Sequence, residues 1–129
     1  MIMGNNVKIN IVLSLADKKI AEEIVGKAKN DILVWQDLVK TYRNRGVSTY
    51  KLRRIILALL SKGKIIELRC RLFTTKEYLE RTPTDVLTNK IKEIVLKSGL
   101  KKCGKPIGIP YGKIIVAITK SKEVKVYIS

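Results

Sequence analysis

The chain has 129 residues, of which 46% are hydrophobic, and it carries 27 Lys and Arg against 11 Asp and Glu, a formal net charge of +16. This size and composition suit one globular domain and exclude an intrinsically disordered chain. So large an excess of positive charge predicts a polyanionic partner, which is usually nucleic acid and more rarely a membrane surface.

Residue types that serve metal binding and acid–base catalysis are scarce. The chain has no His and only two cysteines, Cys70 and Cys103. This leaves too few ligands for a zinc site and removes the commonest general base. We therefore expect no catalytic residues, no metal and no cofactor, and we do not expect an enzyme. The sequence leaves open whether the two cysteines form a disulfide.

Two observations bear on the location of the protein. Its first ten residues lack the basic start and long apolar run of a secretory signal. Its longest purely apolar run, Ile55–Leu60, is far too short for a membrane span. We expect an intracellular, cytoplasmic protein with no membrane contact. The abundance of Lys, Ile, Val and Leu, with Gln36 as the single Gln, is compatible with a thermophile.

Hydrophobic periodicity predicts a mixture of helices and strands. Apolar residues at every second position indicate a strand at 7–13, and helical spacing with Ser14 as N-cap follows it. The predicted elements in chain order are strand 7–13, helix 15–30, helix 34–44, helix 49–61, strands 65–69 and 72–74, helix 76–81, helix 83–98, and a hairpin of strands near 113–119 and 124–128. The Gly- and Pro-rich connector at 99–112 is the candidate boundary. We expect one domain at 1–99 and an extension at 100–129.

The predicted helices have suitable residues at their ends. Ser48 or Thr49 is expected to cap helix 49–61, and Thr75 is expected to cap helix 76–81. Thr82 is expected to cap the next helix, with Pro83 in its first helical position. The glycines expected to terminate helices are Gly46, Gly63 and Gly99.

Helix 49–61 combines an apolar stripe with a basic outer side. Its apolar residues at i, i+3, i+4, i+7 and i+8 are Leu52, Ile55, Ile56, Leu59 and Leu60. Tyr50, Arg53 and Arg54 fall on the opposite side. Leu57 also falls there, and because an apolar side chain is a poor phosphate contact, we interpret it as packing against the C-terminal part of the chain. The helix is thus expected both to fill the core and to present a binding face.

The positive charge is concentrated in residues 40–71, where ten Lys and Arg accompany one acid, Glu67. An ordinary solvated helix would interleave the two signs of charge, so this excess favours an anion-binding surface over charges that only maintain solubility. The candidate nucleic-acid-binding residues are Arg43, Arg45, Ser48, Thr49, Tyr50, Lys51, Arg53, Arg54, Lys62, Lys64, Arg69 and Arg71.

A helix, a tight turn at "NRGVS", an apolar second helix and the run "LSKGKIIELRCRLFTTKEYL" follow one another within residues 15–81. This order resembles the winged helix-turn-helix superfamily, which includes small archaeal and viral regulators. The resemblance implies an α+β fold with a winged helix-turn-helix core, an additional helix and a C-terminal β-hairpin. It also implies that Thr49, Arg53 and Arg54 read base edges while the surrounding basic residues contact phosphates.

Arg69 and Arg71 flank the bend between the two short strands, where the resemblance places the wing. They either reach a minor groove or phosphates, or protect the exposed edge of the ribbon from pairing with another strand, and the two roles are compatible. Trp35 and Tyr42 are expected in the core. Tyr50 is the better candidate for an aromatic contact to nucleic acid, with simple packing as its alternative.

We therefore expect a double-stranded DNA-binding protein, a transcription regulator, for which a homodimer would suit two half-sites. One alternative is an RNA-binding structural component of a ribonucleoprotein such as the ribosome, which would meet structured RNA by shape and phosphate contacts. Another is a winged-helix protein–protein adaptor whose basic face docks an acidic partner.

Overall fold

The computed structural model describes residues 11–100 and 102–129, and within them helices and strands are mixed. The elements are α1 (Leu15–Ala28), β1 (Leu33–Val34), α2 (Trp35–Arg43), α3 (Thr49–Ser61), β2 (Ile66–Leu68), β3 (Leu72–Thr74), α4 (Lys76–Arg81), α5 (Thr84–Ser98), β4 (Ile114–Ile118) and β5 (Val124–Ile128). The protein is therefore of the α+β class, as the sequence predicted.

The strands form two small antiparallel sheets. In the first, the order is β1-β3-β2, so β3 is central and its Phe73 lies between Leu33 and Glu67. The second is the hairpin of β4 and β5, in which Ile115 is paired with Tyr127. Both strands of the predicted hairpin and both strands at 65–74 are confirmed, although β2 is shorter than predicted.

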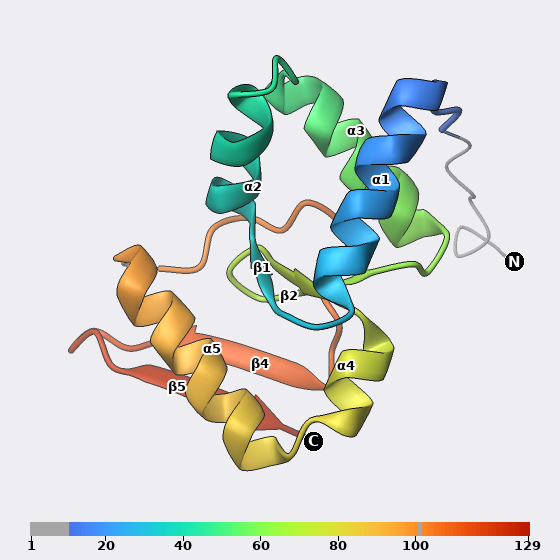
Figure 1. Ribbon diagram of the computed structural model, residues 1–129. Helices are drawn as coiled ribbons and strands as arrows, with labels where there is room; N and C mark the ends of the chain where they lie inside the picture. Colours follow the sequence, from blue (N-terminus) through green and yellow to red (C-terminus); the bar gives the residue numbers. More distant parts are fainter. Residues whose placement is uncertain (1–10, 101) are drawn as a thin grey trace, which may run out of the picture.

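Two apolar clusters lie on opposite faces of the three-stranded sheet, because side chains alternate along a strand. Phe73 belongs to the cluster formed with α1, α2 and α3, which we call the helical core. Leu68 and Leu72 belong to the cluster formed with α4, α5 and the hairpin, which we call the hairpin core. Figure 1 shows the same division, with α1, α2 and α3 on one side of the sheet and α5, β4 and β5 on the other.

Side-chain caps start three of the helices at residues that the sequence indicated, and for α3 the cap is Ser48 and not the alternative Thr49. The hydroxyls of Ser14, Ser48 and Thr75 accept hydrogen bonds from backbone N–H groups in the first turns of α1, α3 and α4. The prediction for α5 was wrong. Thr82 ends α4 by donating its hydroxyl to the carbonyl of Tyr78 at 2.6 Å, and Pro83 is the capping position before Thr84.

The strand predicted at 7–13 lies mostly outside the described residues. Residues 11–13 are described and form no strand. Leu13 is nevertheless buried in the helical core, next to the start of α1. Among the described residues, no helix is both long and apolar enough to cross a membrane.

The connector after α5 is held against the three-stranded sheet. Cys103 forms a disulfide with Cys70 in the β2–β3 turn, and the N–H of Tyr111 donates to the carbonyl of Glu67 at 2.7 Å. Val95 of α5 and Val124 of β5 share the hairpin core. The division expected near residue 99 stays a prediction, and this core contains residues from both sides of it.

Candidate nucleic-acid interface

Helix α3 is positioned by its apolar side and presents polar side chains on the other. Leu52, Ile55 and Ile56 are almost completely buried in the helical core. On the opposite side Tyr50 is 72% exposed, and Arg53 and Arg54 are both exposed. The predicted contrast between a buried stripe and a basic outer side is therefore present in the structure.

The arginines of this outer side are available for a ligand. Among the residues that the structure describes, neither Arg53 nor Arg54 has an ion-pair partner. The first turn of α3 contains no acid, and Ser48 is its cap. The positive end of the helix dipole thus adds to the side-chain charges, which favours an anion near the start of α3.

The burial of Leu57 and Leu60 differs from what the helical spacing of apolar residues predicted. Leu57, assigned to the outer side, is only half-exposed and packs partly against the helical core. Leu60, assigned to the buried stripe, is half-buried and lies against Gly108 of the connector. The exposed basic side of α3 is therefore confined to its first two turns, where Tyr50, Arg53 and Arg54 lie.

The end of α2 holds another arginine next to this face. Gly46 has a positive φ of 79°, and the N–H of Val47 donates to the carbonyl of Tyr42 at 2.9 Å, which closes the turn. Arg43 donates from Nη2 to Oγ1 of Thr49 at 3.2 Å. Arg43 and Thr49 are thus brought together, and both are exposed beside the start of α3.

Two of the candidate residues are paired with acids of α1. Arg45 forms a two-point interaction with Glu23, and Lys51 lies 3.4 Å from Oδ1 of Asp17. The hydrogen bonds from Arg45 hold the pKa of Glu23 below its usual value of 4.5. Part of the charge of Arg45 and Lys51 is thereby neutralised. The acids lie more than twenty residues before their partners, so local spacing gave no signal of these pairs.

The same carboxylate accepts a hydrogen bond from a buried tyrosine. Tyr42 is fully buried, and its hydroxyl donates to Oε1 of Glu23 at 3.2 Å. Burial, with the charge of Glu23, raises the pKa of Tyr42 to about 12. Trp35 is also buried and packs edge-on against Phe73. Both aromatic residues therefore lie in the core, as the sequence predicted.

The two arginines of the β2–β3 turn differ in exposure and in hydrogen bonding. Arg69 is exposed, whereas Arg71 is half-buried and donates from Nε to the carbonyl of Lys105 at 2.6 Å. Cys70 and Arg71 both have positive φ values, of 67° and 55°. The turn is short and tied to the connector, so Arg69 is the one of the two whose guanidinium is directed to solvent.

Glu67, the single acid of residues 40–71, does not reduce the surface charge. It is 1% exposed, and its carboxylate accepts hydrogen bonds from the N–H groups of Ile107 and Gly108 at 2.8 and 2.6 Å. Sequence reasoning counted this residue as a charge and missed its contact with the connector. All the charged side chains that this segment exposes are consequently basic.

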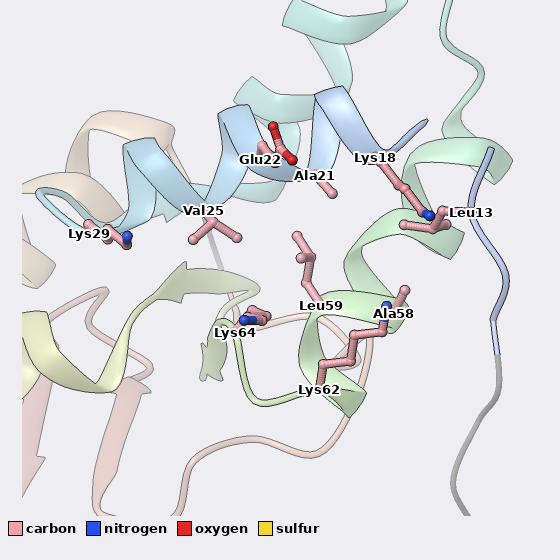
Figure 2. Close-up of a pocket in the computed structure, with 10 residues that line it drawn as sticks. All are labelled: Leu13, Lys18, Ala21, Glu22, Val25, Lys29, Ala58, Leu59, Lys62 and Lys64. Carbon is pink, nitrogen blue, oxygen red and sulfur yellow. The ribbon is translucent and has the colours of Figure 1, made fainter. Parts of the chain in front are cut away.

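Lys62 and Lys64 lie apart from the outer side of α3. Both line a groove between α1 and α3, where they are joined by Lys18 and Lys29, as Figure 2 shows. The structure therefore divides the predicted set of residues between two surfaces. Helical periodicity gave no reason to group the lysines of α1 with those after α3, because the grouping depends on how the two helices pack.

Comparisons with models of protein families, with curated proteins and with solved structures yielded no match to this chain. The site must accordingly be interpreted from its own geometry. In residues 11–100 and 102–129, no three His, Cys, Asp or Glu side chains are arranged to hold a metal ion.

Proposed function

We propose that this chain binds double-stranded DNA as a winged helix-turn-helix transcription regulator. The observation that carries the proposal is the outer side of α3, where exposed Tyr50, Arg53 and Arg54 stand opposite a buried apolar stripe. Arginine suits this role because its planar fork matches the O6 and N7 acceptors of guanine in the major groove.

The order of elements supports the winged-helix arrangement. Helices α2 and α3 are joined by a tight turn, and α3 leads directly into the β2–β3 ribbon. In helix-turn-helix proteins the start of the second helix contacts base edges, and here Thr49 and Arg43 flank that start. Arg69 in the ribbon turn would contact phosphate or the minor groove.

A first experiment compares binding of random duplex DNA, structured RNA and single-stranded DNA over a series of salt concentrations. We expect a preference for duplex, with a slope of log K against log salt of about −4 or steeper, because several phosphates release their counterions. Tighter binding to structured RNA would instead favour the ribonucleoprotein alternative. A partner that is retained after nuclease treatment would favour the protein–protein adaptor.

A double variant tests the residues themselves. Arg53→Ala with Arg54→Ala should abolish preference for a selected duplex sequence and leave the melting temperature nearly unchanged, because both side chains are exposed. Lys120→Ala with Lys125→Ala removes the same charge from the exposed surface of the hairpin and should retain sequence preference. If the two variants lost preference equally, or if the arginine variant unfolded, the assignment to α3 would be wrong.

A homodimer remains part of this proposal. Helix α5 buries Leu87, Ile91 and Val95 in the hairpin core and leaves Val86 and Leu96 exposed. Sedimentation of the chain with and without a duplex of two half-sites tests whether two copies bind together.

A further inference from the structure

A groove lies between α1 and α3 and is distinct from the outer side of α3. Its volume is about 450 Å³, within the range of roughly 300–1,000 Å³ typical of small-molecule sites. Apolar side chains from both helices form its floor, namely Ala21, Val25, Ala58 and Leu59, and Leu13 closes one end. Figure 2 shows Val25 and Leu59 directed toward each other across this groove.

The groove is surrounded mainly by positive charge. Lys18, Lys29, Lys62 and Lys64 line it, with Glu22 as the only acid among its lining residues. None of the ion pairs of the described residues involves these four lysines. In Figure 2 Lys18 of α1 and Lys62 after α3 both reach toward the end occupied by Leu13.

From this combination we infer that the groove binds an amphiphilic anion, a molecule with a carboxylate head and an unbranched apolar chain. The ammonium groups of Lys18 and Lys62 would hold the head, and the chain would lie along Val25 and Leu59. An apolar floor enclosed by cations is complementary to such a ligand, since burial of the chain and pairing of the head occur together. A nucleic-acid backbone would use the lysines and leave the apolar floor in contact with water.

The inference concerns another surface and does not depend on DNA binding. It can be tested on the full chain with dodecanoate, kept below its aggregation concentration and titrated by calorimetry. We expect saturable binding of dodecanoate at one site. Butyrate, which lacks the long chain, and dodecyltrimethylammonium, which has the chain with a cationic head, should each bind at least about tenfold more weakly. Equal binding of the cationic amphiphile, or no binding of dodecanoate, would overturn the inference.

Paired variants locate the site. Lys18→Gln with Lys62→Gln should weaken dodecanoate binding about tenfold or more, because both charge-assisted contacts are lost. Lys120→Gln with Lys125→Gln removes the same charge from the hairpin and should leave binding unchanged. Equal weakening by the two pairs would mean that only net charge attracts the ligand, which would contradict a built site.

Two further measurements use the unmodified chain, so they test the groove even if a variant folds poorly. Methyl chemical shifts of the unmodified chain should change at Val25 and Leu59 on addition of dodecanoate, and changes confined to other residues would exclude the groove. Duplex DNA should not displace dodecanoate. Displacement, with loss of DNA affinity in the Lys18 and Lys62 variant, would assign the groove to nucleic acid instead.

Discussion

At the scale of single residues, Glu67 is a charged residue in the sequence that the structure places in the interior. As the only acid of residues 40–71 it could partly offset the basic surface, yet its carboxylate is buried and accepts two backbone N–H groups of the connector. A buried carboxylate is tolerated when hydrogen bonds satisfy it. Glu67 therefore contributes to the position of the connector and adds no charge to the surface.

We expect Glu67→Ala to lower the free energy of unfolding by about 2–3 kcal/mol, because the N–H groups of Ile107 and Gly108 lose a charged acceptor inside the protein. Glu67→Gln should cost less, since its amide oxygen can still accept. Urea denaturation measures both. Glu80→Ala, at an exposed position of α4, is the control and should stay within about 0.5 kcal/mol of the parent. An equally small change at Glu67 would contradict the anchoring role.

Gly108 shows a steric requirement at the same contact. A Cβ atom built there would lie 2.9 Å from Cδ1 of Leu60, whereas one at Gly112 would meet no atom within 4 Å. Gly108→Ala should therefore displace the terminal methyl of the half-buried Leu60 side chain and destabilise the protein only modestly, by about 0.5–1 kcal/mol, and Gly112→Ala should have little effect. Thermal unfolding of the two variants compares them directly. Indistinguishable melting temperatures would show that Leu60 moves aside without cost.

At the scale of elements, α1 and α3 are joined by charged groups as well as by the helical core. Lys51 contacts Asp17, and Arg45 in the turn before α3 contacts Glu23. These pairs connect α1 with α3 and with the turn before it, whereas Tyr50, Arg53 and Arg54 on the outer side of α3 are exposed. Helix α1 thus has a supporting role for the proposed interface that its own sequence did not indicate.

The Glu23 pair predicts a pH dependence. Because the pKa of Glu23 is lowered in the folded protein, its contribution to stability is fully present above the ordinary value of 4.5 and is lost as the pH falls through the folded-state pKa. The difference in unfolding free energy between the parent and Glu23→Gln should therefore stay constant from pH 7 down toward 4.5 and shrink as the pH falls further. Glu22→Gln, on the adjacent exposed position, is the charge-matched control, because Glu22 takes part in none of the ion pairs of the described residues. A difference that did not vary with pH would exclude the ion pair as its source.

Over the whole molecule, the connector joins the two apolar clusters through the three-stranded sheet. Ile107 belongs to the helical core, whereas Cys103 packs partly against the hairpin core. The disulfide between Cys70 and Cys103 links residues 33 positions apart and closes this arrangement. The β2–β3 turn, where the proposed wing stands, is therefore attached to the C-terminal part of the chain.

Removal of this cross-link should destabilise the protein by about 3–4 kcal/mol, since a loop of this length loses its closure constraint in the unfolded state. Urea denaturation of the oxidised chain with and without reductant measures the effect. The variant with Cys70→Ala and Cys103→Ala should have the lower stability and should not respond to reductant. If reductant had the same effect on parent and variant, the change would not come from the disulfide.

Local patterns predicted most of the elements correctly. In α1 the buried residues Ile20, Ile24 and Ala28 recur at helical spacing, and in β5 the more buried residues recur at every second position. Both patterns arise because one side of the element is buried, and each can be recognised within a few residues of sequence. The error at Thr82 arose because its hydroxyl can serve either of two adjacent helix ends, and only the structure showed that it bonds to Tyr78.

By itself the sequence determined the α+β class, the caps at Ser14 and Thr75, and the basic outer side of α3, because each follows from short-range periodicity or composition. It left Ser48 and Thr49 as alternative caps of α3, and the structure has Ser48 in that position. Tertiary structure alone decided that Glu67 is buried, that Arg45 pairs with Glu23, and that Cys70 meets Cys103. It also gathered the four lysines of the groove from α1 and from the end of α3. These contacts join segments that lie from 22 to 46 positions apart along the chain. Chain proximity does not specify them, since they depend on which faces of the elements pack together.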